Sequence, residues 1–199
     1  MERMRVIGGK FRSRTLVAPR GLDTRPTNDR LRETLFNVLA PHIEGAVFLD
    51  LYAGSGAVGI EAISRGAEQA FFVENSQPTL IVLNENLSNL HIGQRHAAVE
   101  LRKSAVFLKN KMNWRYKGFP GAFHIVFLDP PYDAVMEYEQ VLNMLGGECS
   151  DLLMPEAIIV AEHRRKQKLE ESYGSLHRYR LLEQGDAALS FYSVSGDAK

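Results

Sequence analysis

One stretch of the chain decides the fold: His124-Ile125-Val126-Phe127-Leu128-Asp129-Pro130-Pro131-Tyr132. Its apolar part, 125–128, is rich in β-branched and aromatic residues, which is typical of a strand buried on both faces of a parallel sheet. Two prolines cannot continue a hydrogen-bonded ladder, so the strand ends at Asp129. Open α/β sheets bind ligands at the carboxyl ends of their strands. The stretch therefore predicts that Asp129, the Pro130 carbonyl and Tyr132 hold a flat group that carries an amine; an ordinary strand exit with a surface tyrosine is the alternative.

The segments around this strand alternate between strand and helix patterns. We expect strands at 47–52, 70–73, 97–101, 125–128, 157–162, 179–182 and 189–194. We expect helices at about 57–65, 76–90, 105–110 and 137–145, after a first helix that Thr27 or Asn28 caps and that reaches Leu39. This alternation predicts the α/β class: a doubly wound, mostly parallel, seven-stranded Rossmann-like sheet that ends in an antiparallel β-hairpin.

The composition is that of a globular protein from a reducing compartment. Of the 199 residues, 45% are hydrophobic and 24% are charged. No apolar run approaches the roughly 20 residues that span a bilayer, and Met1–Arg5 do not resemble a signal peptide. The single cysteine, Cys149, excludes an internal disulfide and a cysteine-based metal cluster. We expect a cytoplasmic monomer that uses no metal.

Positive charge gathers at the N-terminus although the net charge of the chain is zero. Residues 1–32 hold nine Lys and Arg against three Asp and Glu, a net +6, which leaves −6 on the remainder. A basic arm on an acidic body predicts a polyanionic partner at the arm. A solvated charged hairpin is the equally weighted alternative.

The arm itself has the pattern of a small β-hairpin. Short strands are expected at 4–7 and 14–18, with Gly8-Gly9 as the turn signal, so we divide the chain into an arm and linker, 1–26, and a main domain, 27–199. Cations interleaved with an aromatic side chain suit a nucleic-acid backbone with an unpaired base nearby. The expected RNA-contacting residues are Arg5, Lys10, Arg12, Arg14 and Arg25, and Arg30 and Arg32 could extend this basic surface.

A glycine-rich turn follows the strand at 47–52. Gly54-Ser55-Gly56-Ala57-Val58-Gly59 matches G-x-G-x-x-G, and Glu74 lies 20 residues beyond Gly54, at the end of the next strand. This pattern fits a dinucleotide fingerprint whose acidic residue accepts a hydrogen bond from a ribose hydroxyl. The same spacing serves S-adenosylmethionine (SAM), so the glycines by themselves do not decide between the two cofactors.

Two motifs favour SAM. Asp50-Leu51-Tyr52-Ala53-Gly54-Ser55-Gly56 resembles the first motif of SAM-dependent methyltransferases, and Asp129-Pro130-Pro131-Tyr132 resembles the (Asp/Asn)-Pro-Pro-(Tyr/Phe) signature of those that act on exocyclic amino groups. With the arm included, the chain resembles the RsmD family of bacterial 16S rRNA guanine N2-methyltransferases. The resemblance covers nearly the whole length, through segments 5–10, 24–37, 50–56 and 127–132.

The resemblance implies SAM as cofactor and a guanine of ribosomal RNA or the small ribosomal subunit as substrate. It assigns the reaction to Asp129, Pro130 and Tyr132. It assigns cofactor binding to Asp50, Tyr52, Gly54, Ser55, Gly56, Glu74, Asn75, Ser104, Ala105 and Asp129.

Three positions depart from the family pattern. Ser104 stands where an Asp is usual before Ala105, so a hydroxyl would have to accept the hydrogen bond of the adenine amine. His124 replaces a frequent Asp and is expected to be structural. Ser13 stands where Gly is common, which should stiffen the turn of the arm.

Three other functions remain open on the sequence. An adenine N6-methyltransferase of DNA uses the same Asp-Pro-Pro-Tyr signature, although 199 residues leave little room for a target-recognition domain. A non-catalytic RNA-binding module could retain the fold. An NAD-linked oxidoreductase would be selected by binding of NAD in place of SAM.

Overall fold

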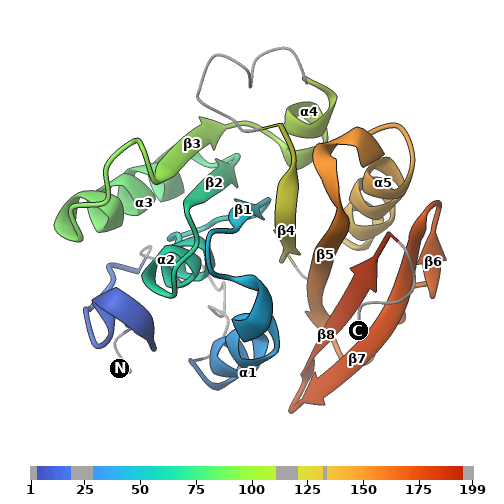
Figure 1. Ribbon diagram of the computed structural model, residues 1–199, viewed down its shortest axis with the longest axis horizontal. Helices are drawn as coiled ribbons and strands as arrows, with labels where there is room; N and C mark the ends of the chain where they lie inside the picture. Colours follow the sequence, from blue (N-terminus) through green and yellow to red (C-terminus); the bar gives the residue numbers. More distant parts are fainter. Residues whose placement is uncertain (1–3, 19–28, 111–120, 132–133, 195–199) are drawn as a thin grey trace. The chain divides into compact units, whose positions relative to one another are not determined.

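A computed structural model describes residues 4–18, 29–110, 121–131 and 134–194, which form two compact units, 1–103 and 104–199 (Figure 1). None of the helices in these ranges is long and apolar enough to cross a membrane. The proposed cap residues Thr27 and Asn28 lie outside the described residues.

The first unit contains three parallel strands in the order β3-β2-β1. Its elements are η1 (Gly9–Phe11), α1 (Asp29–Leu39), η2 (Ala40–His42), β1 (Val47–Asp50), α2 (Ala57–Ser64), β2 (Gln69–Glu74), α3 (Gln77–Asn89) and β3 (Ala97–Leu101). Helix α2 packs against β1 and β2, and α3 packs against β2 and β3. Every residue of β1 is buried, as the continuous apolar run predicts.

The helices of this unit begin and end where their sequences predict. Helix α1 buries Leu31, Leu35, Phe36 and Leu39 on one face. Helix α3 is capped by Ser76, whose Oγ accepts a hydrogen bond from the Thr79 N–H at 3.4 Å, and a proline occupies its first turn.

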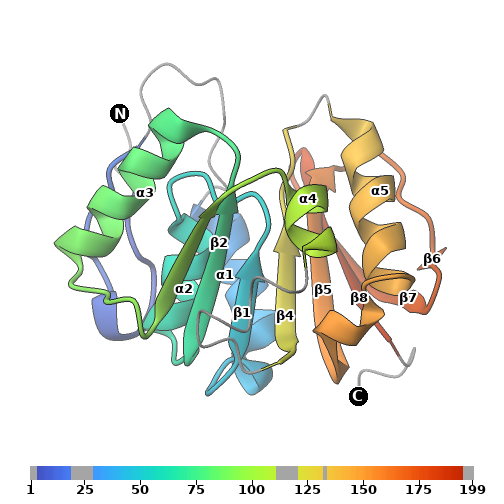
Figure 2. The same ribbon diagram turned by 90° about the horizontal axis from the view of Figure 1, so that it is seen from above.

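The second unit contains five strands in the order β4-β5-β8-β7-β6. Its elements are α4 (Ser104–Lys109), β4 (Phe123–Leu128), α5 (Val135–Gly146), η5 (Ser150–Leu152), β5 (Leu153–Arg164), β6 (Ser172–Tyr173), β7 (Leu176–Gln184) and β8 (Ala187–Ser193). Strands β4 and β5 are parallel, whereas β5, β8, β7 and β6 pair antiparallel in that order. Helices α4 and α5 contact each other beside these strands (Figure 2).

The predicted α/β class, the parallel strands and the C-terminal antiparallel hairpin, β7–β8, are confirmed. The predicted number of seven strands is wrong, because the described residues contain eight. The additional strand, β6, has only two residues and follows a strongly polar stretch, so it carries no periodic pattern. It forms because Leu176 and His177 of β7 offer it an edge.

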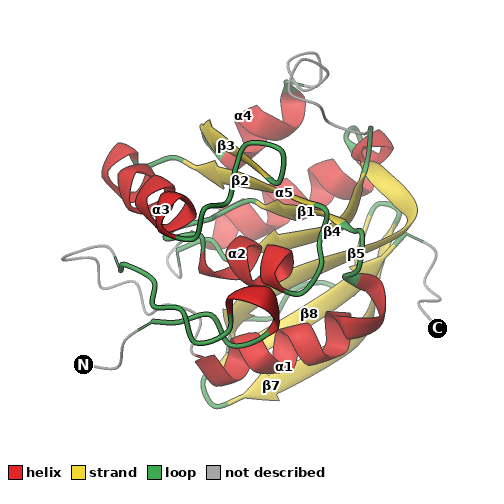
Figure 3. Cartoon of the chain, turned by 60° about the vertical axis from the view of Figure 1, so that its left-hand side comes forward, coloured by secondary structure: helices red, strands yellow, loops and turns green. Residues whose placement is uncertain are grey.

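The predicted N-terminal β-hairpin is not found in the described part of the arm, residues 4–18. One isolated antiparallel bridge, Arg5 to Thr15, and the short helix η1 stand in its place, and Figure 3 shows this segment as loop. The two sides of the arm are still joined by backbone hydrogen bonds, from the Leu16 N–H to the Met4 carbonyl at 2.9 Å and from the Val6 N–H to the Arg14 carbonyl at 3.0 Å. Other arm N–H groups donate to side chains of α2. The division into 1–26 and 27–199 remains a prediction.

Candidate cofactor and substrate sites

The glycine turn leaves the carboxyl end of β1 and leads directly into α2. Gly54 and Gly56 both have a positive φ, +54° and +84°, a conformation that favours glycine. The turn is held to the neighbouring strand by the hydrogen bond from the Ala53 N–H to the Val73 carbonyl, at 3.0 Å. Its backbone is therefore fixed at the sheet edge where parallel sheets bind their ligands.

Glu74 closes this turn from the end of β2. Its Oε2 accepts a hydrogen bond from the Gly54 N–H at 2.9 Å, and its Oε1 accepts one from the Ser76 N–H at 2.7 Å. The side chain is half-buried. A carboxylate has about four lone-pair sites, so these two bonds orient Glu74 and leave it acceptor capacity for a diol.

Asp50 supports the turn from the interior. Its side chain is 1% exposed, and Oδ2 accepts a hydrogen bond from the Gly59 N–H at 3.2 Å. Burial raises the pKa of this carboxyl to about 7; the Gly59 and Tyr52 N–H groups oppose the rise, and the charge of Glu74 adds to it. Asp50 thus binds a proton more tightly than a surface Asp does, and its hydrogen bond to Gly59 ties it to the first turns of α2.

The chemistry of the residues in this unit suits SAM, because they offer open space beside the glycine turn and an oriented carboxylate. A Cβ placed on Gly54 would meet nothing within 4 Å, so open space borders the turn beside the oriented Glu74 carboxylate. Tyr52 is half-buried, Ser55 is buried and Asn75 is exposed. Glu74 would hold the ribose hydroxyls, and the turn would lie against the amino-acid portion of the cofactor.

Other residues predicted for the cofactor site belong to the second unit. Ser104 is the first residue of α4 and is buried, and Ala105 follows it half-buried. Their contact with the adenine remains a prediction.

The Asp-Pro-Pro segment begins directly after β4, as predicted. Asp129 is half-buried, Pro130 is buried and Pro131 is exposed. The Pro131 carbonyl accepts a hydrogen bond from the Ala134 N–H at 2.8 Å, next to the start of α5. Tyr132 lies outside the described residues.

Four of the five predicted RNA-contacting residues lie in the described arm, and all four are exposed: Arg5, Lys10, Arg12 and Arg14. The Lys10 ammonium lies 5.4 Å from the centre of the Phe11 ring, so a cation and an aromatic face are presented together. Arg5 forms an ion pair with Asp29 at 3.3 Å. Arg25 lies outside the described residues.

The predicted extension of this basic surface through Arg32 is wrong. Arg32 is fully buried and forms ion pairs with Asp29, at 2.9 Å, and with the buried Glu61, at 3.9 Å. It also donates a hydrogen bond to the Arg5 carbonyl. Arg30 is exposed, as expected.

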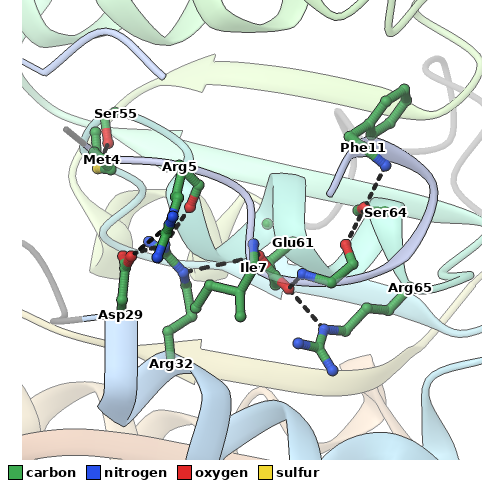
Figure 4. A network of polar contacts seen from close by, with 12 residues as sticks. Met4, Arg5, Ile7, Phe11, Asp29, Arg32, Ser55, Glu61, Ser64 and Arg65 are labelled. Carbon is green, nitrogen blue, oxygen red and sulfur yellow. Dashed lines mark hydrogen bonds and ion pairs between the residues drawn. The ribbon is translucent and has the colours of Figure 1, made fainter. Parts of the chain in front are cut away.

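Glu61 anchors the arm to α2, a role that none of the sequence motifs indicates (Figure 4). Its two oxygens accept hydrogen bonds from the Ile7 and Gly8 N–H groups, at 2.7 and 2.8 Å. Ser64 adds two more, because its Oγ accepts from the Phe11 N–H at 2.9 Å and donates to the Gly8 carbonyl at 2.6 Å. One signal was available: Glu61 is the only charged residue in the apolar helix Ala57–Ser64, and buried charges are paired.

Both the sequence and the structure of this chain match known proteins. Parallel strands, a glycine turn and an oriented carboxylate at the next strand end suit a nucleotide-like cofactor, and the comparisons identify the class as the SAM-dependent methyltransferases. A family model described as "Conserved hypothetical protein 95" matches residues 4–193. The chain belongs to this family, the RsmD/YlbH family.

Three relatives illustrate the likeness. "Putative rRNA methyltransferase YlbH" of Bacillus subtilis is 37% identical over 97% of this chain and 100% of its own length. "Ribosomal RNA small subunit methyltransferase D" of Escherichia coli K12 is 39% identical over 91% of this chain and 86% of its own. The solved structure "Putative methyltransferase yhhF from Escherichia coli" has a TM-score of 0.79 at 37% identity and covers 96% of this chain and 97% of its own.

Proposed function

We propose that this protein transfers a methyl group from SAM to the exocyclic N2 amine of a guanine in small-subunit ribosomal RNA, in the cytosol. The observation that carries the proposal is the half-buried Asp129 with Pro130 and Pro131 directly after β4, since this acceptor pair is suited to an amine. The names of the relatives, which include "Ribosomal RNA small subunit methyltransferase D", support ribosomal RNA as the substrate.

The proposed chemistry rests on holding a weak nucleophile. The lone pair of the guanine amine is delocalised into the ring, so the amine must be oriented before it can attack. Asp129 and the Pro130 carbonyl would each accept a hydrogen bond from one amine hydrogen, which points the nitrogen lone pair away from both acceptors. Tyr132 would stack on the base. When bound, SAM supplies a methyl group activated by its sulfonium.

No strong base is needed before the transfer, because the amine proton becomes acidic once the nitrogen is alkylated. Asp129 would stabilise the positive charge that develops on that nitrogen. Positioning and electrostatic stabilisation would then provide most of the rate acceleration.

The arm would provide affinity without reading sequence. The exposed Arg5, Lys10, Arg12 and Arg14 would neutralise phosphates, which makes binding depend on salt. A base in a duplex cannot reach a pocket of this kind, so the target must be unpaired or flipped out.

The test is methyl transfer from labelled SAM to small ribosomal subunits that lack the modification, followed by nucleoside analysis. We expect N2-methylguanosine from the wild type and at least a ~100-fold lower turnover in Asp129→Ala at saturating SAM. Glu139→Gln, which removes an exposed carboxylate on α5, is the control and should leave turnover unchanged.

Other products would identify the rival functions. Label on adenine would move the activity to the N6-methyltransferases. Failure to bind SAM would favour a non-catalytic RNA-binding module, whereas SAM binding without methyl transfer would mean that the substrate is a different one. Turnover that Asp129→Ala leaves intact would refute the role of this residue.

A further inference from the structure

One buried amide in the first unit joins the arm to the glycine turn. Asn86 lies on α3 and is 1% exposed. Its Oδ1 accepts a hydrogen bond from the Val17 N–H at 2.7 Å, and its Nδ2 donates to the Val17 carbonyl at 3.0 Å. The same Nδ2 donates to the Ser55 carbonyl, within the glycine turn, at 2.9 Å.

Through these three hydrogen bonds, the Asn86 amide binds Val17 and Ser55 at the same time. Val17 belongs to the arm and Ser55 to the turn, and neither is close to Asn86 in the sequence. An amide has one acceptor oxygen and two donor hydrogens, so each Asn86 group is engaged and the side chain cannot rotate without losing hydrogen bonds in a buried setting. The orientation of the turn and the seating of the arm therefore depend on one another.

A second contact also joins the arm to the glycine turn. The Ser55 Oγ lies 3.5 Å from the sulfur of Met4, and both residues are buried. Ser55 is thus held by the arm directly through Met4 and indirectly through Asn86.

We propose that Asn86 is a positioning residue that couples the arm to the cofactor-binding turn, so that RNA bound at the arm raises the affinity for the cofactor. The inference rests on the proposed function. Phosphates bound by Arg5, Lys10, Arg12 and Arg14 would order the arm and fix Val17. Val17 fixes the Asn86 amide, which in turn fixes the Ser55 carbonyl. The glycine turn has then already lost its conformational entropy when the cofactor binds, so cofactor binding is more favourable. By linkage, the cofactor raises the affinity for RNA by the same factor.

The other anchor of the arm provides a matched control. Ser64 also holds the arm by two hydrogen bonds, yet it lies at the last position of α2 and has no hydrogen bond to the glycine turn among the described residues. Ser64→Ala should therefore weaken the seating of the arm without removing the connection to Ser55.

The experiment measures the dissociation constant of tritiated S-adenosylhomocysteine by equilibrium dialysis, with and without saturating unmethylated small ribosomal subunits. We expect the subunits to tighten cofactor binding to the wild type at least ~5-fold, the lower range of allosteric coupling. In Asn86→Ala the ratio should fall to within ~2-fold of one, and in Ser64→Ala it should stay near the wild-type value.

A second variant guards against loss of folding. Asn86→Asp keeps the size of the side chain and the acceptor for the Val17 N–H, but it removes the donor to the carbonyls of Val17 and Ser55, so it should also lose the coupling. A ratio of one in the wild type, or a wild-type ratio in a folded Asn86 variant, would overturn the inference. Methyl transfer without coupling would overturn only this inference, whereas cofactor binding without any RNA binding would overturn the proposed function as well.

Discussion

The buried carboxyl of Asp50 makes the stability of this protein depend on pH in an unusual direction. Its pKa is raised from 3.8 to about 7 in the folded state, chiefly by burial. An unfolded chain would ionise this group near its ordinary pKa, so the folded state holds more protons over the interval between the two values. Stability therefore falls as pH rises from about 4 to about 7, and the full loss corresponds to about 4 kcal/mol.

Asp50→Asn removes this penalty and keeps the shape of the side chain. The amide oxygen can still accept the Gly59 N–H, so the turn should remain attached to α2. Any cost of placing the NH₂ group is the same at every pH, whereas the electrostatic cost of the wild type grows with pH. The free energy of unfolding of the variant relative to the wild type should thus rise by up to about 4 kcal/mol between pH 4 and pH 8.

The assay is urea unfolding of both proteins across this pH range, followed by circular dichroism. Subtracting the two profiles cancels all other titrating groups, which the variants share. Asp151→Asn, at an exposed position, is the control and should give a flat difference. A flat difference for Asp50→Asn too would refute the raised pKa, and a difference that falls with pH would mean that Asp50 is stabilised as a carboxylate.

Three further predictions concern the arm and its anchors. Gly9→Ala should destabilise the protein by at least ~2 kcal/mol, because φ is +73° and the new Cβ would overlap the Ser64 carbonyl. Gly45→Ala is the control: φ is +70° but the new Cβ would meet nothing within 4 Å, so it should cost only the backbone strain of about 1–2 kcal/mol. Equal effects of the two variants in thermal unfolding would rule out the overlap. Ser13→Gly should stabilise by about 1 kcal/mol, since Ser13 has φ +67° and is exposed, whereas Ser13→Ala should give no gain in the midpoint of urea unfolding. Arg32→Met should cost about 1–3 kcal/mol, because Asp29 and the Arg5 carbonyl lose a charged donor while Glu61 keeps its ion pair with Arg65. The exposed Arg30→Met should stay within ~0.5 kcal/mol, and a near-neutral Arg32→Met would mean that the ion pairs only balance their desolvation.

The position of Ser13 also explains a departure from the family pattern. The backbone of Ser13 has a left-handed conformation, with φ +67°, which favours the glycine that the resemblance leads us to expect there. Ser13 adopts it at a cost that the hydrogen bond from its N–H to the Val6 carbonyl, at 2.9 Å, helps to offset.

The sequence alone determined the features that depend on neighbouring residues. The apolar runs at β1, β2 and β4, the Ser76 cap and the glycines that adopt positive φ are properties of a few consecutive positions. The same holds for the break of β4 at Asp129, because two prolines end a strand whatever surrounds them. These local signals sufficed for the fold class and for the expected cofactor.

Only the tertiary structure decided how the arm is used. The bonds that seat it join residues 53 to 69 positions apart, from Glu61, Ser64 and Asn86 to backbone groups of the arm. Such bonds leave no periodic pattern, because a backbone N–H can donate to any side-chain acceptor that the fold brings within reach. The same reasoning applies to Arg32, which the sequence places among surface cations. Its burial follows from packing of α1 beside Glu61, and no local pattern encodes that packing.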